Sequence, residues 1–439
     1  MLDAKMRRII LAAALLLFAA CHLSAQHYQV LHSFSGYPDD AAFSVSRLVM
    51  DEHGNLYGTS PGGGAGEGGY CYGEGCGTVF ELSPNGNGGW AASVLYSFCS
   101  IYNNGLCLDG GSSDAGLIID SAGNLYGTTV GGGAQNNTVC ENSGAAGCGT
   151  VFKVSPPAIP GGTWSESVLY SFCADEANGT CLDGWSPQAP VTLDYEGNLY
   201  GTADGGGGHE SAGVVFELSP GADGWNETVL YNFCSLGQGA ACPDGDFPYL
   251  AGVTFDKSGN LYGTTFDGGT KDTAGEGVVY RLSPGSGTWK ESVLTVFPLP
   301  GQLYGYPSGG VTFDPAGNLY GSFEGPNGGV FRLNRKSGKR NFFAFNGSDG
   351  EQPIGGVTLD PKHGVLYGTN SGASGGTGNI YQIDSQGKET VLYQFCSQPN
   401  CADGYLPWAT LIMDKSGNLY GTTEFGGDYG MGVVFELTP

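Results

Sequence analysis

The chain has 439 residues, of which 80 are glycine, 12% are aromatic and only 13% are charged. This composition fits short strands and tight turns, and it leaves little material for amphipathic helices. A formal net charge of −25 disfavours nucleic acids and anionic membrane surfaces as partners, because both would be repelled. We therefore expect an all-β protein that binds neither nucleic acid nor an anionic membrane.

Residues 1–25 have the pattern of a secretory signal peptide. Three basic residues precede an apolar run over residues 9–20, and small residues suited to cleavage follow at Ser24 and Ala25. The run is too short to span a membrane and no comparable run follows it, so the mature chain is not expected to be integral to a membrane. The predicted location is exported: periplasmic, extracellular or on the cell surface.

Cys21 offers an alternative way of processing the same segment. The stretch Phe18-Ala19-Ala20-Cys21 resembles a lipoprotein cleavage box, with Phe where Leu is usual. Because of that departure we favour plain cleavage near Ala25, and a lipid anchor at Cys21 is the alternative. Either cleavage removes three basic residues and one acidic residue, which takes the net charge from −25 to −27.

A ten-residue stretch, best seen as Asp-Ser-Ala-Gly-Asn-Leu-Tyr-Gly-Thr-Thr at residues 120–129, appears seven times along the chain. The copies begin at Asp51, Asp120, Asp194, Asp256, Asp314, Asp360 and Asp414. Apolar and often β-branched residues lead into each aspartate. The aspartate can accept hydrogen bonds from turn amides and the following glycine can take a positive φ, so each copy predicts a tight β-hairpin.

The hairpin opens a longer unit with four predicted strands. In one complete unit the strands are residues 117–120, 124–129, 149–154 and 164–172. The last third strand, residues 432–437, has no fourth strand after it, whereas residues 28–34 match a fourth strand and stand alone at the N-terminus. We expect these two segments to pair and close a ring, because closure removes exposed sheet edges.

These units predict an all-β fold, a seven-bladed β-propeller with four-stranded blades in which the N-terminal strand completes the last blade. A fixed repeat overrides the two or three domains that length alone suggests, so residues 26–439 are expected to form one domain. The blades are expected at residues 46–98, 115–172, 189–233, 250–297, 309–345, 355–395, and 409–439 together with 28–34.

The repeats resemble the GloVer tandem-repeat family of exported bacterial proteins over residues 28–439. The shared pattern runs Gly-Asn-Leu-Tyr-Gly-Thr-Thr, a Gly-Gly stretch and Gly-Thr-Val-Phe, which returns after Thr59 and Thr128. The resemblance implies an exported repeat protein of the choice-of-anchor type with no settled biochemical activity, although this chain lacks the C-terminal sorting tail of anchored members. The Asp-x-x-Gly-Asn hairpins are also similar to those of NHL-type propellers, which supports the fold only.

Twelve cysteines remain once Cys21 is set aside, and they form six pairs of near neighbours. The pairs are Cys71 and Cys76, Cys99 and Cys107, Cys140 and Cys148, Cys173 and Cys181, Cys234 and Cys242, and Cys396 and Cys401. An even number in an exported chain predicts six local disulfides. Zinc is the rival interpretation, disfavoured because the pairs lie in different repeats and no His-rich or four-cysteine cluster accompanies them. We expect neither a metal nor a cofactor.

The loops between second and third strands and those between blades should emerge on one face of a propeller, and here they contain the cysteine pairs. Loops on a rigid scaffold often carry function, so this is the predicted binding face. Its candidate ligand-binding residues are Asp109, Asp183, Asp244, Asp349, Asp403, Trp185, Trp408 and Tyr306. Aromatic rings beside carboxylates suit sugars. A structural role is the favoured alternative for the aspartates, because Asp-Gly before a strand is also a turn signal.

No catalytic signature stands out, so no catalytic residue is predicted. The first hypothesis is a secreted, monomeric binding or surface-interaction propeller that takes a glycan or another exported protein. The alternative is a polysaccharide hydrolase or lyase that uses carboxylates of the same face and needs two acids about 5–9.5 Å apart. A structural envelope protein is the second alternative.

Overall fold

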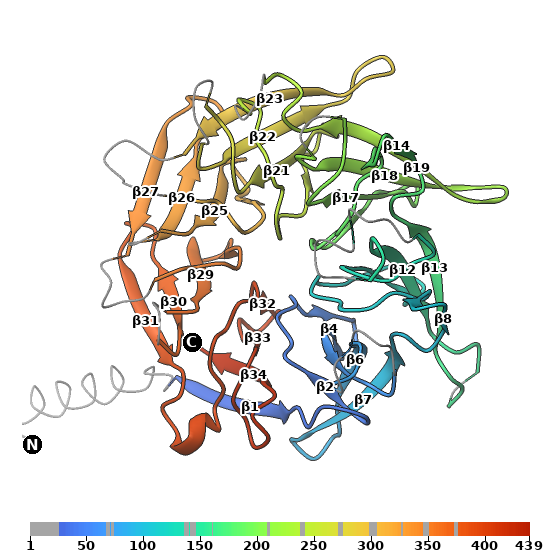
Figure 1. Cartoon of the computed structure of the whole chain (residues 1–439). Helices are drawn as coiled ribbons and strands as arrows, with labels where there is room; N and C mark the ends of the chain where they lie inside the picture. The colour runs from blue at the N-terminus through green and yellow to red at the C-terminus, as the bar shows by residue number, and fades with distance from the viewer. Residues whose placement is uncertain are drawn as a thin grey trace, which may run out of the picture.

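The computed structural model describes residues 26–439 except 67–70, 72–73, 136–139, 141–145, 160, 209–210, 238–241, 271–274, 298–304, 326–327, 346–350 and 373–375. The predicted signal peptide and Cys21 lie outside the described residues. Every element with described bounds is a β-strand apart from one 3-10 turn, η1 (Pro399–Cys401). Seven four-stranded antiparallel sheets stand around a ring (Figure 1), which confirms the predicted propeller.

The blades follow one another in chain order, each with its shortest strand innermost. Blade 1 contains β3 (Val49–Met50), β4 (Leu56–Ser60), β6 (Thr78–Pro84) and β7 (Trp90–Ser97), and blade 2 contains β10 (Ile118–Ile119), β11 (Leu125–Thr129), β12 (Thr150–Ser155) and β13 (Ser165–Ser171). Blade 3 contains β16 (Thr192–Leu193), β17 (Leu199–Ala203), β18 (Val214–Gly221) and β19 (Gly224–Asn232), and blade 4 contains β20 (Thr254–Phe255), β21 (Leu261–Thr265), β22 (Val278–Ser283) and β23 (Lys290–Val296).

The second half of the ring repeats this plan. Blade 5 contains β24 (Thr312–Phe313), β25 (Leu319–Phe323), β26 (Gly329–Leu333) and β27 (Arg340–Ala344), and blade 6 contains β28 (Thr358–Asp360), β29 (Val365–Asn370), β30 (Asn379–Ile383) and β31 (Glu389–Gln394). Blade 7 contains β32 (Ile412–Met413), β33 (Leu419–Thr423), β34 (Val433–Thr438) and the N-terminal β1 (His27–Ser33). Three small two-stranded sheets lie in the loops: β2 (Ala41–Ala42) with β5 (Gly62–Gly63), and the hairpins β8 (Tyr102–Asn103) with β9 (Leu106–Cys107) and β14 (Glu176–Ala177) with β15 (Thr180–Cys181).

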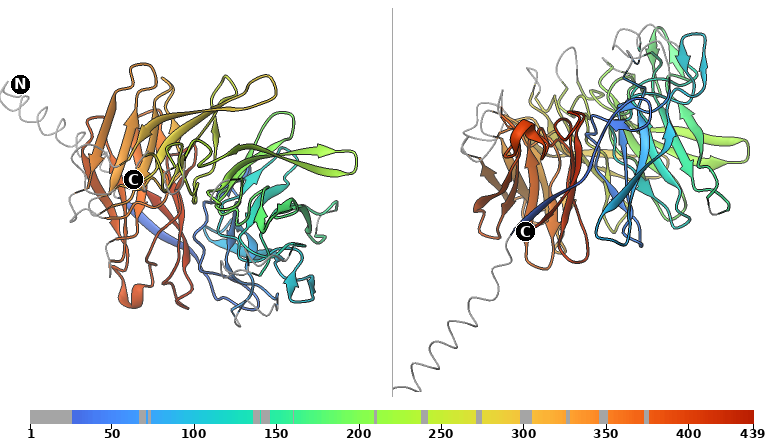
Figure 2. Two further views of the ribbon diagram at one scale, coloured as in Figure 1. Left: turned by 45° about the horizontal axis from the view of Figure 1, so that its top comes forward. Right: turned by 90° about the horizontal axis from the view of Figure 1, so that it is seen from below.

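Strand β1 closes the ring as predicted. It pairs antiparallel with β34, from His27 opposite Thr438 to Ser33 opposite Val433. The side view on the right of Figure 2 shows the blue β1 running beside the red C-terminal strands. The ring of Tyr28 also stacks on Tyr393 of blade 6, with centroids 3.8 Å apart. The first strand of the chain therefore joins the last two blades.

The repeated aspartate forms the hairpin that the sequence predicted. One carboxylate oxygen of Asp120 accepts hydrogen bonds from the backbone amides of Ala122 (2.8 Å) and Asn124 (2.9 Å). The other accepts from the Asn124 side chain (2.7 Å) and the Tyr126 hydroxyl (3.0 Å). Burial would raise the pKa of Asp120, but these hydrogen bonds outweigh it and lower the pKa below its ordinary value.

The core consists of seven hydrophobic clusters, one at each junction between neighbouring blades. Each contains a phenylalanine from the end of one blade packed edge-on against an aromatic ring of the next blade's third strand. The pairs are Phe34–Phe80, Phe98–Phe152, Phe172–Phe216, Phe233–Tyr280, Phe297–Phe331, Phe345–Tyr381 and Phe395–Phe435. Edge-on geometry is favoured by the quadrupole of the rings.

The glycine of Leu-Tyr-Gly-Thr makes room for that second ring. A Cβ added at Gly127 would lie 2.7 Å from Phe152 Cζ and 2.9 Å from a methyl carbon of Leu117. The equivalent glycine of every other blade faces its own third-strand aromatic ring in the same way. The repeat therefore needs glycine at this position because a side chain would collide with the aromatic ring.

Replacing Gly127 by alanine should lower the free energy of unfolding by about 1–3 kcal/mol, because the added methyl group overpacks the junction between blades 1 and 2. Urea titration of Gly127→Ala measures the loss. Gly208→Ala is the control, since a Cβ at Gly208 meets nothing within 4 Å. Adding Phe152→Leu should restore part of the loss, and a Gly127→Ala protein as stable as the parent would refute this packing role.

Buried acid pairs occupy three of the blade junctions. Glu166, Glu227 and Glu291 lie on the fourth strands of blades 2, 3 and 4, and one carboxyl oxygen of each is buried without a hydrogen-bond partner among the described residues. Burial, then the charge of Asp109, Asp183 or Asp244 in the preceding loop, raises their pKa values to about 8, about 8 and about 7. These glutamates hold a proton when folded at pH values where the unfolded chain has lost it.

The raised pKa values predict that alkaline conditions weaken the junctions. Because the folded-state pKa of each glutamate exceeds its unfolded value of about 4.5, its contribution is complete below pH 4.5 and is lost as the pH rises towards 8. Glutamine at all three positions should therefore flatten the decline in unfolding free energy between pH 5 and pH 9. Exposed Glu52→Gln should keep the parent slope. If the unfolding free energy fell equally steeply with pH in the parent and in the triple variant, the raised pKa values of the three glutamates would be contradicted.

Candidate functional site

A cavity of about 490 Å³ lies on the axis of the ring, and residues of all seven blades line it. The lining comes from the innermost strands and from the residues just before them, and in blades 2, 3, 4 and 7 the chain reaches these residues from a loop that contains a disulfide. The second strand of each blade returns to the same face. The residues just before the innermost strands therefore form the mouth of the channel on the predicted binding face.

The channel mouth is where the repeats differ from one another. Six residues before each motif aspartate, the seven blades have Val45, Asp114, Gln188, Leu250, Ser308, Ile354 and Trp408. All except Ser308 line the cavity. Four residues before the aspartate, Arg47 takes a place that is Gly116, Pro190, Gly252, Gly310, Gly356 and Thr410 in the other blades. A requirement common to every blade cannot explain residues that change from blade to blade.

The mouth has two unlike sides. Arg47, Asp114, Gln188 and Trp408 belong to blades 1, 2, 3 and 7, which are consecutive around the closed ring. Leu250 and Ile354, from blades 4 and 6, line the remaining arc. The Trp408 side chain is half-buried, and its Nε1 has no hydrogen-bond partner among the described residues. The polar arc offers hydrogen-bond donors and acceptors opposite an apolar wall.

Two further carboxylates come from the ends of second strands. Asp204 follows β17 and Glu424 follows β33, and both are coupled by charge to Asp114. Burial raises the pKa of Asp114 to about 6, and burial together with the charge of Asp114 raises the pKa of Asp204 well above its ordinary value. Asp204 is only 4% exposed and its Oδ1 has no partner among the described residues. Such carboxyls keep their protons to a higher pH than an ordinary aspartate, and when protonated they can donate as well as accept.

Arg47 is the one cation among the described residues that line the cavity. It lies deep within the ring, where burial lowers the pKa of its guanidinium, yet its side chain reaches the solvent of the cavity. Its backbone lies against Gly116 of blade 2, where an added Cβ would come within 2.9 Å of Arg47 atoms. A guanidinium stays charged at any pH that the protein would meet.

The predicted Tyr306 belongs to an aromatic group beside the mouth. Its ring stacks on Phe266 with centroids 4.7 Å apart, and its amide donates to the carbonyl of Glu324 at 3.0 Å. Tyr249 packs edge-on against the same Phe266 ring. Burial, then the charges of Asp204 and other acids, raises the pKa of Tyr249. The aromatic group of Phe266, Tyr306 and Tyr249 therefore lies close to Asp204 and Asp114.

The predicted aspartates of the loops are buried at 1% exposure or less. Each accepts a hydrogen bond from the tyrosine of the preceding strand: Asp109 from Tyr96, Asp183 from Tyr170, Asp244 from Tyr231 and Asp403 from Tyr393, at 2.6–2.8 Å. Each also accepts from a backbone amide just after the first cysteine of its loop, at 2.8–2.9 Å. These contacts favour the structural alternative for the four residues. Asp349 lies outside the described residues.

The two predicted tryptophans have different surroundings. Trp185 lies over Gly205, where a Cβ would overlap the indole, and it packs on a core cluster that includes Cys140, Cys148 and Cys181. Trp408 lines the channel mouth. Packing on the disulfide loop favours a scaffold role for Trp185, whereas Trp408 stays a candidate for ligand contact.

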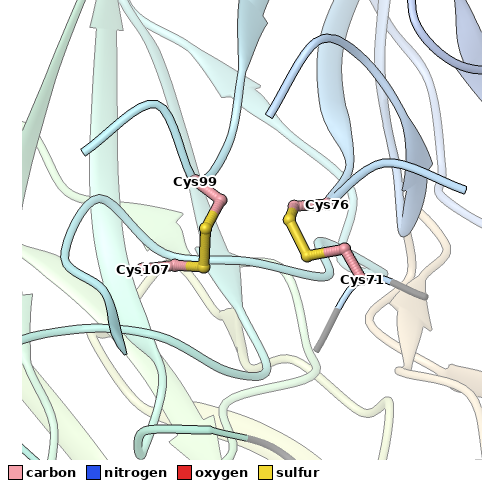
Figure 3. A group of neighbouring side chains, drawn as sticks. All are labelled: Cys71, Cys76, Cys99 and Cys107. Carbon is pink, nitrogen blue, oxygen red and sulfur yellow. A yellow bond between two sulfur atoms is a disulfide. The ribbon is translucent and has the colours of Figure 1, made fainter. Parts of the chain in front are cut away.

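All six predicted disulfides are present. The expectation that no four-cysteine cluster exists is wrong, because two pairs of bridges lie side by side. The four Sγ atoms of Cys71, Cys76, Cys99 and Cys107 are within 4.8 Å of one another (Figure 3). Those of Cys140, Cys148, Cys173 and Cys181 form a second such group. The loop between the second and third strands meets the loop after the fourth strand, and sequence spacing does not show this.

The fold and the axial cavity define a tandem-repeat β-propeller. The chain belongs to the Gloeobacter/Verrucomicrobia repeat family, whose sequence model matches residues 135–339 and 322–439. The resemblance drawn from the Gly-Asn-Leu-Tyr-Gly-Thr-Thr and Gly-Thr-Val-Phe patterns is thereby confirmed. No curated protein matches the chain. Among the described residues, no helix is long and apolar enough to cross a membrane.

Solved structures with a similar fold belong to several kinds of protein. One is the extracellular domain of a hybrid two-component system from B. thetaiotaomicron, at 11% identity and a TM-score of 0.51, with 93% of this chain and 39% of that chain covered. Another is a puromycin hydrolase mutant, at 12% identity and a TM-score of 0.51, with 87% of this chain and 50% of that chain covered. A protein assigned as a 6-phosphogluconolactonase from Bacteroides uniformis has 14% identity, a TM-score of 0.46 and coverage of 79% and 84%. At these identities the likeness shows the fold alone.

Proposed function

We propose that this protein is an exported binding propeller that takes a neutral oligosaccharide, or the end of a polysaccharide chain, at the channel mouth. Six disulfides support an exported location, because such bridges persist in oxidising compartments. The strongly acidic chain disfavours an anionic ligand.

The observation that carries this proposal is the divergence of the repeats at the mouth. Structural positions are alike in all blades, whereas Arg47, Asp114, Gln188 and Trp408 each occupy a position where other blades have unlike residues. The cavity volume of about 490 Å³ falls within the usual range for small-ligand sites. Selection for the stability of a blade gives no reason for a guanidinium, a carboxyl, an amide and an indole to converge there.

The chemistry of the mouth suits a sugar. The indole of Trp408 can pack against the apolar C–H face of a pyranose ring, and Arg47 and Gln188 can donate to its hydroxyl oxygens. Asp114, which lines the cavity, can accept from hydroxyl groups or, when protonated, donate to them. A polyhydroxylated ligand needs this mixture of donors and acceptors, whereas an apolar ligand would leave the buried carboxyls unsatisfied.

Retention of the protein on a panel of neutral polysaccharides tests the proposal. Trp408→Ala should weaken retention by about 1–3 kcal/mol with little change in melting temperature, because the indole lines a solvent-filled mouth. Asp114→Asn should weaken retention to a smaller extent, since the amide has the size of the carboxyl group but cannot gain or lose a proton.

Trp185→Ala is the matched control on the same face. It should lower the melting temperature and leave retention unchanged, because this indole packs on the disulfide loop outside the cavity lining. Unchanged retention in Trp408→Ala, or equal losses in both tryptophan variants, would argue against a sugar site at the mouth.

A polysaccharide hydrolase or lyase is the second candidate function. The observation in its favour is Asp114, which lines the cavity and whose pKa burial raises to about 6, as a general acid requires; its charge also raises the pKa of the buried Asp204 behind it. Release of reducing or unsaturated ends from the same panel, lost in Asp114→Asn, would favour this function over binding alone.

A further inference from the structure

Two clusters of four cysteines lie on the loop face, outside the channel mouth. The blade 1 cluster consists of Cys71 and Cys76, between β4 and β6, and Cys99 and Cys107, after β7 (Figure 3). The blade 2 cluster repeats this plan with Cys140 and Cys148, between β11 and β12, and Cys173 and Cys181, after β13. In both, two loops of one blade bring two bridges into contact distance.

The fold does not require the doubled bridges. Blades 3 and 6 close the loop after the fourth strand with a single bridge, Cys234–Cys242 or Cys396–Cys401, and have no cysteine between their second and third strands. Their sheets are four-stranded all the same, and the same buried aspartate braces the loop. The second bridge in blades 1 and 2 therefore adds a pair of sulfurs that the blade itself does not need.

The geometry of each cluster fits a tetrahedral metal. Zinc bound to four thiolates has Zn–S distances of about 2.3 Å, which places the sulfurs about 3.8 Å apart. The four Sγ atoms of each cluster lie within 4.8 Å of one another, so small side-chain rotations would suffice. Seven of the eight cysteines are buried, Cys71 being the half-buried exception. Four thiolates in tetrahedral array are typical of zinc and of iron–sulfur centres, and we take zinc, which binds without redox chemistry of its own.

We propose that each cluster is a zinc site in its reduced form, and that the paired disulfides are the oxidised form of the same site. Two molecules of a dithiol reductant each cleave one bridge of a cluster, becoming disulfides as they supply four electrons in all. The four cysteine thiols then bind one Zn²⁺ and release four protons. In the reverse step two molecules of a small disulfide accept four electrons in all, become thiols as they take up four protons, and re-form both bridges, which expels the metal.

This assignment gives the loops of blades 1 and 2 a connection in either redox state. When the bridges are intact they hold each loop, and when they are reduced the metal ties the same two loops together. Blades 3 and 6 lose their one disulfide on reduction, and hydrogen bonds, among them those of Asp244 and Asp403, then hold those loops. The protein would hold one zinc ion per cluster under reducing conditions and release it on oxidation.

Metal analysis of the reduced protein tests the proposal. The full mature chain is reduced anaerobically with a dithiol, given zinc, freed of excess and assayed for bound metal. We expect two zinc ions per chain, one with Cys71→Ser/Cys76→Ser or Cys140→Ser/Cys148→Ser, and none with all four substitutions. Cobalt in place of zinc should show the spectrum of tetrahedral thiolate coordination.

The control is Cys234→Ser/Cys242→Ser, which removes a bridge from blade 3 and should leave both zinc ions bound. Zinc should also raise the melting temperature of the reduced parent, which keeps the test decisive if the metal-free reduced chain unfolds. The proposal is overturned if the reduced parent neither binds nor is stabilised by zinc. It is equally overturned if the blade 3 control loses as much metal as the cluster variants.

Discussion

An aromatic ring seated over a glycine at each blade junction is the contact on which the rest of the structure depends. Phe152 can reach Phe98 of blade 1 only because Gly127, on the neighbouring strand of its own blade, has no side chain. The same contact occurs at all seven junctions, including Phe34–Phe80, where β1 joins the last blade to the first. Seven similar junctions let the blades repeat around the ring, and β1 completes the last sheet so that every blade has four strands.

Because the junctions are alike, the fold does not require the particular residues that differ between blades. Residues on the axis differ from blade to blade, and they bring Arg47, Asp114, Gln188 and Trp408 to one mouth. The cysteine clusters follow the same rule, since only blades 1 and 2 contain doubled bridges. The proposed sugar site and the proposed zinc sites both rest on departures from the repeat, one on the axis and the other in the loops.

The sequence predicted the features that depend on local or periodic chemistry. The Asp120 hairpin is set by residues within six positions, and pairing of β1 with β34 follows from a unit that lacks its fourth strand. The channel mouth could not be found by seeking what recurs, because its residues are those that do not recur. Comparing the seven copies position by position would have singled out Arg47 among four glycines, a proline and a threonine. The burial of Asp109 depends on Tyr96, whose hydroxyl arrives from a neighbouring strand, and no motif shows that contact.

The central claim is that the mouth serves function and the junctions serve the fold. The most direct test is the unfolding free energy of a triple variant, Arg47→Gly, Asp114→Ser and Trp408→Ile, in which each new residue is the one that another blade has at the same position. The account predicts stability within about 1 kcal/mol of the parent, as for substitutions away from packed contacts. A loss of more than about 3 kcal/mol would show that these residues belong to the scaffold.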